Sequence, residues 1–463
     1  MTAAQRWALG LTASAALLVG LDASVVSTAL TTIRLDLHAS DEQLEWTVNA
    51  YTLSFAVLLL TAAALGDRFG RRRLFAAGLG VFAVASVGCA LAPSAGWLFA
   101  ARAVQGAGAA AVMPMALALL GVAIAPAVRA RALGAFTAVV GASVPAGPLL
   151  GGAIVNGTSW RWIFWINVPV VAILLPLALA RIEASRGPRV RLDLPGLLLG
   201  TAAAFSLVWG LVRANAVSWA SAETLTALGV GLALLCVFIV VERRIEQPMM
   251  PMRLFTLPAF AAGNAAIFFV WASTFGSVYF MAQFFQVGLG SQPLEAGLRL
   301  MPWGAMTVIV PRVVGALIQR YGERPFAVGG MLLHGASMMW IAALASPDVA
   351  YWRLVAPLIL SGVGVAASIP ATLSAVLGAV TPPDLGKASG AYSALRQLGG
   401  AFGVAAVVAV FAASGEYASA RTFVDGFGPA MITCAALAAC GVLAGLGVPG
   451  RRVPVPATAA SPS

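Results

Sequence analysis

The chain has 463 residues, of which 60% are hydrophobic and only 10% are charged, and its formal net charge is +11. About a quarter of the residues of an ordinary soluble domain are charged, so this composition excludes that class. The basic residues lie in short loops rather than on one face, which argues against nucleic-acid binding. We therefore expect a polytopic protein of the lipid bilayer that binds no nucleic acid.

Long apolar runs recur from the first residues to the end of the chain. A spanning helix needs about 20 apolar residues, and these runs are too unbroken for the alternating pattern of a transmembrane barrel. The first run, after Arg6, is longer than the ~7–15-residue core of a signal peptide, so we interpret it as a retained helix. The pattern predicts an all-α protein with fourteen transmembrane helices, at about 8–33, 45–65, 74–92, 96–120, 132–155, 161–180, 194–212, 224–242, 259–285, 295–318, 326–345, 354–379, 389–413 and 427–448.

The distribution of basic residues predicts the orientation. With the amino terminus inside, the cytoplasmic segments hold 19 of the 28 basic residues, the outer segments hold 6, and Arg102, Arg312 and Arg396 lie within spans. Cytoplasmic loops carry the excess of Lys and Arg, and an even number of spans puts both termini on one side. Lys387 is the only lysine, which points to a GC-rich bacterial genome. We expect a bacterial inner-membrane protein with both termini in the cytoplasm.

The cysteines give no indication of a redox or metal site. All of them lie inside apolar runs, where cysteine behaves as a small buried hydrophobe, and their spacing does not resemble a zinc site. The chain also has no phosphate-binding loop of the GxxxxGK[ST] kind. We expect no disulfide, metal, cofactor or covalent chemistry. The four positions are Cys89, Cys236, Cys434 and Cys440.

The densest charge cluster is GDRFGRRR, from Gly66 to Arg73, between two apolar runs. Such a run can simply be a solvated loop that anchors helix ends, or it can also form a gate. A partial copy, QRYGER, begins at Gln319, where the glutamine replaces Asp67. Both copies follow a helix that runs from outside to inside. Two related helix bundles with an extra helix pair between them would produce this spacing.

The chain resembles the major facilitator superfamily, and within it the fourteen-helix drug:proton antiporter branch (EmrB/QacA type). The resemblance covers nearly the whole chain. It is carried by GDRFGRRR between helices 2 and 3, RAVQGAGAA from Arg102 in helix 4, GPLLGG from Gly147 to Gly152 in helix 5, LDASVVSTAL in helix 1, WRWIFWINVP at Trp160–Pro169 and GKASGAYSALRQLGGAFG from Gly386 to Gly403.

The resemblance implies the major facilitator fold, with two six-helix bundles and two additional central helices. We expect an amino-terminal bundle at 1–180, a linker with the additional helices at 181–258, a carboxy-terminal bundle at 259–450 and a disordered cytoplasmic tail at 451–463. The tail is rich in Pro, Ala and Ser, as disordered segments are. The protein is expected to act as a monomer. In the second copy of the loop, Gln319 stands where the first copy has the carboxylate of Asp67.

Two groups of residues are implied to move during transport. In the loop, a carboxylate at Asp67 can pair with arginine or face the positive end of another helix, and breaking that contact would release one conformation. In helix 5, small residues allow close helix approach and prolines permit a bend; the helix either packs tightly or also seals and rocks against the second bundle. The gating residues are Gly66, Asp67, Arg68, Gly70, Arg71 and Arg72, and those of the antiporter helix are Gly141, Pro145, Gly147, Pro148, Gly151 and Gly152.

Asp22 is the only acid deep inside a predicted span, since the other sixteen lie in loops or near helix ends. A charge at that depth costs about 2.5–3.5 kcal/mol, so the carboxylate should face a cavity or a partner. From the helical rise, Asp22 lies roughly 20 Å from the inner end of its helix and Arg102 roughly 10 Å from the outer end of helix 4, so their heights agree in a core about 30 Å thick. Asp22 can form a salt bridge that serves packing alone, and Arg102 can instead snorkel to the headgroups. The resemblance implies the third possibility, that the two residues form the proton-coupling site.

The cargo cavity is expected to be mainly apolar with a few polar anchors. Arg312 and Arg396 lie roughly 12 Å from the inner ends of their helices; they either snorkel to headgroups or bind an electronegative group of the cargo. Aromatic and amide residues at helical spacing either line the cavity or pack in the core and against lipid. The residues predicted to line it are Asn49, Tyr51, Asn264, Trp271, Tyr279, Gln283, Gln286, His334, Arg312 and Arg396.

The pattern as a whole predicts a proton-coupled exporter of amphipathic small molecules, working by alternating access with a proton and a small substrate as its partners. A narrower exporter of one metabolite or self-made antibiotic fits the same residues. The alternative from a different functional class is a channel or a non-transporting receptor. A channel would show rings of charged residues, whereas this chain has a single acid deep inside its predicted spans.

Overall fold

The computed structural model describes residues 1–124, 132, 135–136, 139–186, 193–216, 220–246, 248, 250–381 and 384–450. Within this part the secondary structure is helical, without strands. The expected tail at 451–463 lies outside the described residues, as does part of the span expected at 132–155. The side chains of Asp67, Pro145 and Arg312 lie outside them too, so their predicted roles stay predictions.

Helices occupy the apolar runs in chain order. The first group is α1 (Ala3–Leu37), α2 (Asp41–Phe69), α3 (Arg71–Ala90), α4 (Ala95–Ala123), α6 (Ser143–Gly157), α7 (Trp162–Trp165) and α8 (Asn167–Arg181). Next come α9 (Leu194–Ala216), α10 (Ala222–Arg244) and the short η1 (Met252–Thr256). The last group is α11 (Pro258–Gln283), η2 (Phe284–Gly288), α12 (Pro293–Arg299), α13 (Met301–Tyr321), α14 (Arg324–Leu344), α15 (Tyr351–Gly378), α16 (Leu385–Ala412) and α17 (Ala420–Leu446).

Ten helices of the described residues are long and apolar enough to cross a membrane, and each coincides with a predicted span. Helices α2, α6, α9 and α12–α13 lie at the other four predicted ranges. The chain is therefore an all-α, multi-pass membrane protein, while the count of fourteen crossings stays a prediction.

Two tight turns each contain a glycine with a positive φ. Gly70 separates α2 from α3 with φ of 111°, and Gly322 separates α13 from α14 with φ of 83°. Both values lie in a region that residues with a Cβ rarely adopt. The two glycines are the ones paired in the sequence repeat, so the repeat is also present in the fold.

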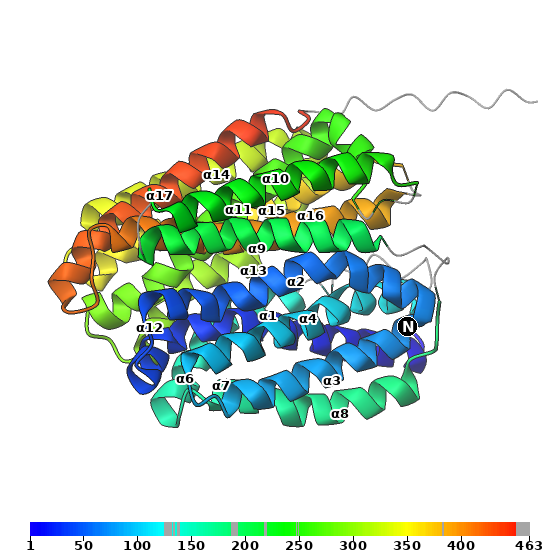
Figure 1. The fold of residues 1–463 in the computed structure, drawn as a ribbon, viewed down its shortest axis with the longest axis horizontal. Helices are drawn as coiled ribbons and strands as arrows, with labels where there is room; N and C mark the ends of the chain where they lie inside the picture. The colour runs from blue at the N-terminus through cyan, green and yellow to red at the C-terminus, as the bar shows by residue number, and fades with distance from the viewer. Residues whose placement is uncertain are drawn as a thin grey trace, which may run out of the picture.

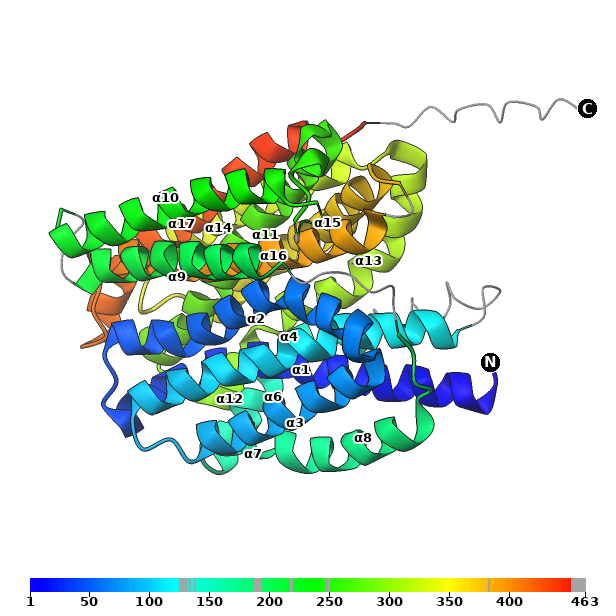
Figure 2. The same cartoon turned by 45° about the vertical axis from the view of Figure 1, so that its right-hand side comes forward.

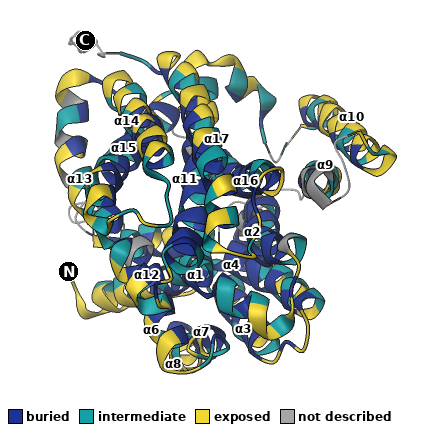
Figure 3. Cartoon of the chain, turned by 90° about the vertical axis from the view of Figure 1, so that its left-hand side faces the viewer, coloured by how far each residue is buried: buried dark blue, intermediate teal, exposed yellow. Residues whose placement is uncertain are grey.

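The helices before α9 and those after η1 form two groups that lie against each other (Figure 1). Helix α9 packs on α2 and α16, and α10 packs on α9, so the two helices lie along the outside of both groups (Figure 2). Exposed positions gather on the outward faces of α8, α10 and α13 (Figure 3). Many of them are large hydrophobic side chains, such as Ile173 of α8, Leu232 of α10 and Val313 of α13, as a lipid-facing surface requires.

Among the described residues, the hydrophobic clusters shared by the two groups of helices lie toward one end, and one of them joins Trp46 and Val57 of α2 to Ala401 and Ala405 of α16. At the end where α1 meets α2, called here the α1–α2 end, one cluster joins Leu30 and Ile33 of α1 to Phe280 and Phe284 of the second group. At the opposite α2–α3 end, the clusters belong almost entirely to one group or the other. The molecule is therefore closed between its two halves at the α1–α2 end.

Candidate functional site

The centre of the first helix group holds a buried ion pair. Asp22 of α1 is 4% exposed and Arg102 of α4 is 1% exposed, and the Arg102 Nη1 contacts the Asp22 Oδ2. The two residues come from helices far apart in sequence, at the matching heights that the helical rise predicts. A charged pair at this depth is costly unless its remaining hydrogen-bonding capacity is also satisfied.

Further donors complete the carboxylate's surroundings. The Asp22 Oδ1 accepts from the Gln105 Nε2 at 2.8 Å and from the Asn167 Nδ2 at 3.0 Å. Both amides also donate to the Ser86 hydroxyl, at 2.8 Å and 3.2 Å. Asp22 thus receives donors from α4 and α8, and Ser86 of α3 ties these donors together.

Arg102 has acceptors besides Asp22. Its Nη1 donates to the Gln105 Oε1 at 2.7 Å, and its Nε donates to the main-chain oxygen of Thr47 in α2 at 3.2 Å. Its guanidinium carbon lies 4.2 Å from the ring centroid of Tyr51, a distance at which a cation is attracted to an aromatic face. The Tyr51 hydroxyl in turn donates to the main-chain oxygen of Val19 at 3.1 Å.

This arrangement sets a carboxylate against a cation that also has neutral acceptors. Charged Asp22 accepts three hydrogen bonds, so adding a proton to it weakens at least one of them or occupies the remaining lone pair. Arg102 is the cation, and it keeps the neutral oxygens of Gln105 and Thr47 when its bond to Asp22 is lost.

Gln105, Asn167 and Ser86 were not among the predicted site residues. Gln105 follows Arg102 by three positions within RAVQGAGAA, and Asn167 lies within WRWIFWINVP. Both stretches stood out as motifs, so the signal was present. A polar residue in a motif does not reveal its partner, which here lies on α1.

Asp22 is also not the only buried acid. Glu45 and Glu242 are each 1% exposed and Glu323 is 4% exposed. All three lie near helix ends, where a position in the sequence does not indicate burial. The Glu323 Oε1 accepts from Ser374, and the Glu242 Oε2 accepts from the main-chain nitrogen of Met250.

The GDRFGRRR stretch ties the α2–α3 turn to the end of α8. The Arg72 Nη1 donates to the main-chain oxygens of Leu179 and Ile182, at 3.0 Å and 2.9 Å. In the second group, the Arg324 Nε donates to the main-chain oxygen of Val448 at 2.8 Å, just after α17. The paired arginines therefore cap corresponding helix ends, where unpaired carbonyls favour a cation.

The remaining gating residues surround this turn. Arg68 is exposed and lies over the ring of Phe69, and the Arg71 main-chain nitrogen donates to the Ser185 oxygen at 2.9 Å. Gly66 packs closely on α4, since a Cβ there would lie 2.1 Å from the Met115 sulfur. These contacts all lie within the first helix group.

The glycines of α6 face two different helices. A Cβ at Gly147 would lie 2.1 Å from the Ser24 Oγ of α1, and one at Gly151 would lie 2.4 Å from the Thr28 Oγ1 of the same helix. A Cβ at Gly152 would instead lie 2.4 Å from the Pro293 main-chain oxygen, in the second group. A Cβ at Gly141, which precedes α6, would meet nothing within 4 Å among the described residues, so Gly141 has open space beside it there.

Pro148 contributes to the same contact between the groups. Its main-chain oxygen lies 2.4 Å from the position that a Cβ on Gly297 of α12 would take. The expectation that this helix contacts the second bundle therefore applies to Pro148 and Gly152, whereas Gly147 and Gly151 pack inside the first group.

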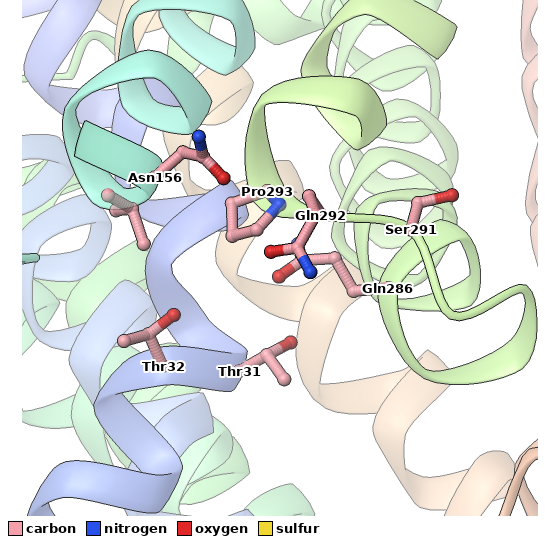
Figure 4. A pocket seen from close by; sticks show the side chains of 8 residues that line it. Thr31, Thr32, Asn156, Gln286, Ser291, Gln292 and Pro293 are labelled. Atoms are coloured by element: carbon pink, nitrogen blue, oxygen red, sulfur yellow. The ribbon is translucent and has the colours of Figure 1, made fainter.

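A polar pocket lies in this seam at the α1–α2 end (Figure 4). It has a volume of about 320 Å³, and none of the residues that line it is charged. Gln286, on the π-helical turn η2, crosses the seam and donates from its Nε2 to the Thr28 main-chain oxygen at 3.2 Å. The pocket is lined by Thr31, Thr32, Val155, Asn156, Gln286, Ser291, Gln292 and Pro293.

The other residues predicted to line the cavity divide into two sets. Asn49, Tyr51, Asn264, Tyr279, Gln283 and His334 are buried. His334 differs most from the expectation, because its Nε2 lies 2.8 Å from the Ser273 Oγ and its Nδ1 lies 2.9 Å from the Ser361 Oγ. It joins α11, α14 and α15 inside the second group, where both ring nitrogens are satisfied.

Trp271 and Arg396 form the other set. Both are half-buried, and the Arg396 guanidinium carbon lies 4.9 Å from the Trp271 ring centroid. The Trp271 Nε1 and the Arg396 Nε have no hydrogen-bond partner among the described residues. The pair thus combines an aromatic surface with unused donors, which is the chemistry expected of a cargo contact.

Comparison with known proteins agrees with this architecture. The family model of the Major Facilitator Superfamily matches residues 12–404. A cephamycin export protein of Amycolatopsis lactamdurans is 38% identical, over 92% of this chain and 88% of its own length. A tetracenomycin C resistance and export protein of Streptomyces glaucescens and the multidrug resistance protein Stp of Mycobacterium tuberculosis are each 35% identical, over 86% of this chain and 74% of their own lengths.

A solved structure has the same fold. The crystal structure of a peptide transporter, POT, in complex with sulfate superposes with a TM-score of 0.67 over 95% of both chains, at 14% sequence identity. At that identity the similarity concerns the fold alone. With the family model matching most of the sequence and relatives above 30% identity along most of its length, this chain belongs to the major facilitator superfamily and has its fold.

Proposed function

We propose that this chain is a proton-coupled exporter of amphipathic small molecules, of the fourteen-helix drug:proton antiporter branch. The observation that carries the proposal is the buried network around Asp22 and Arg102. It holds a titratable group beside a cation that has alternative acceptors. The relatives named for antibiotic export and multidrug resistance support drugs or antibiotics as the cargo.

In this mechanism the two helix groups rock around a central site. The excess of basic residues in the loops at the α2–α3 end makes that end cytoplasmic, so the shared core closes the molecule toward the outside. Asp22 takes up a proton from outside, Arg102 shifts to its neutral acceptors, and release of the proton inside restores the pair. The GDRFGRRR turn, with Asp67, stabilises one of the two conformations.

The same reasoning places the protein in its membrane. We place it in a bacterial inner membrane with both termini in the cytoplasm and fourteen crossings. Residues 1–180 and 259–450 form the two moving bundles, and residues 181–258 supply the two additional helices. The protein works as a monomer, because one chain supplies both moving bundles and the Asp22 network.

The cargo site lies between the bundles, with Trp271 and Arg396 on its wall. An aromatic face and an arginine suit a flat, amphipathic molecule with an electronegative group. A narrower exporter of one antibiotic is the second possibility, favoured by the relatives named for cephamycin and tetracenomycin C. A panel of unrelated compounds separates the two, because the narrow exporter transports one chemical class only.

The test of proton coupling is Asp22→Asn in proteoliposomes or inside-out vesicles. The amide resembles the protonated acid, so this variant should still bind cargo and exchange it, but lose accumulation driven by a pH gradient. The matched control is Asp36→Asn, which removes a partly exposed acid on the same helix that pairs with Arg161. Uphill transport by Asp22→Asn at the wild-type rate would show that protons take another route. Accumulation against a gradient by the wild type excludes a passive channel.

A further inference from the structure

Glu45 of α2 is a second buried carboxyl group, and the proton mechanism above does not use it. It is 1% exposed, and its Oε1 accepts a single hydrogen bond of 3.3 Å, from the Asn49 Nδ2. Its Oε2 has no hydrogen-bond partner among the described residues. Asn49 is also fully buried, with an Oδ1 that lacks a partner there.

The faces of α2 place this carboxyl group at the seam between the bundles. Thr47 faces α4, where its main-chain oxygen accepts from Arg102. Trp46 faces α9, with its ring 5.7 Å from that of Trp209, and Val48 lies in the cluster that both helix groups share. Glu45 and Asn49 are four residues apart and share one face. That face lies between those of Trp46 and Val48, and α2 packs on α16 of the second group, so we place Glu45 on the side of α2 toward the second group at the closed α1–α2 end.

The neighbouring elements bring charged groups near this end, but these have other contacts. On α1 and α4, Asp22 and Arg102 pair with each other, and Arg34 lies over the ring of Tyr417. On α9, Arg213 contacts Glu42 at 3.7 Å and Glu223 at 2.9 Å, and on α16, Arg396 lies over Trp271. Glu42 lies three residues before Glu45 on the same helix. Within the described part of the chain, no cation pairs with Glu45.

An ionised carboxylate without a cation, and with one amide donor, is strongly disfavoured in a water-excluded site. Neutral Glu45 is compatible with the closed seam, and its ionised form requires water. We propose that Glu45 is a second proton-binding site, which holds a proton when the α1–α2 end is closed and loses it to outside water when that end opens. This proton is not carried across the membrane, because the closed seam separates Glu45 from the α2–α3 end.

Linkage fixes the sign of the effect. Closure favours the protonated acid, so protons from outside favour closure, and the closed form loses this stabilisation as the pH rises. A single proton changes the ratio of open to closed forms by at most tenfold per pH unit. The proposal rests on the alternating opening proposed above, but it can be tested without transport.

The experiment measures opening at the α1–α2 end in nanodiscs. Spin labels at Leu35→Cys, at the exposed end of α1, and Ser414→Cys, in the loop after α16, report the distance across the seam in a chain without its native cysteines. The measurement is made in an Asp22→Asn background, so that the response of Asp22 is removed. The open fraction should rise with pH when Glu45 is present, and Glu45→Gln should keep the seam closed without a pH response.

The matched control is Glu42→Gln, which removes the neighbouring acid at the same end and should keep the pH response. Glu45→Asp keeps a titrating group and should keep a response with a shifted midpoint. An unchanged response in Glu45→Gln, or an equal loss in Glu42→Gln, overturns the proposal. If Glu45→Gln does not fold, infrared spectra of the Asp22→Asn protein decide: loss of a protonated-carboxyl band as the seam opens supports the proposal, and its absence contradicts it. If the wild type fails to transport cargo uphill but the open fraction still depends on Glu45 and on pH, the proposed function is contradicted and the proposal for Glu45 stands.

Discussion

The buried pair predicts a strong coupling between Asp22 and Arg102 that a double-mutant cycle can measure. Asp22→Leu leaves the Arg102 charge with the neutral oxygens of Gln105 and Thr47 only. Arg102→Met leaves the Asp22 charge with the amides of Gln105 and Asn167. Removing one partner of a buried pair costs about 3–5 kcal/mol, so each single variant should lose about that much free energy of unfolding.

The double variant should be more stable than either single variant. Replacing a buried ion pair by apolar side chains is often neutral or stabilising, and both amides keep their hydrogen bonds to Ser86, at 2.8 Å and 3.2 Å. The sum of the single losses is about 6–10 kcal/mol. The measured loss in the double variant should therefore fall several kcal/mol below that sum.

The assay is reversible unfolding in mixed detergent micelles, together with uptake driven by a pH gradient. None of the three variants should pump uphill, so a stable double variant without transport would show that the loss concerns the proton step and not folding. Stability losses that add within about 0.5 kcal/mol would refute the coupling. A double variant that pumps like the wild type would show that the proton does not use this pair.

Three further predictions concern packing and topology. Gly147→Leu should abolish transport because a Cβ there would lie 2.1 Å from a serine hydroxyl of α1, whereas Gly141→Leu, at a position with open space, should transport normally; equal activity in both would contradict the packing argument. His334→Ala removes two hydrogen bonds of 2.8 Å and 2.9 Å and should lower the free energy of unfolding by about 2 kcal/mol; thermal melts check this, and a changed cargo profile would instead place His334 in the cavity. Single cysteines at Ala184 and Ser414 test the orientation in intact cells: an impermeant thiol reagent should label only the second.

Much of the fold could be predicted from the sequence because it depends on properties of single segments. A run of about 20 apolar residues is enough to span a membrane, and the distribution of basic residues among the loops predicts an orientation. The pairing of Asp22 with Arg102 was also within reach, since helical rise gives each residue a depth. The repeat around Gly70 and Gly322 is present in the amino-acid sequence, and in the structure both glycines have a positive φ.

The tertiary structure decided what each helix faces. A helix that is hydrophobic all round carries little periodicity to show which side is buried in protein and which faces lipid, so the direction of a side chain depends on helices distant in sequence. For this reason Asn167 joins Asp22, His334 lies between two serines and Gly152 contacts the second bundle while Gly151 does not. Glu45 is the clearest case: its place near a helix end suggested a solvated acid, and only the packing of two bundles at that end excludes water from it.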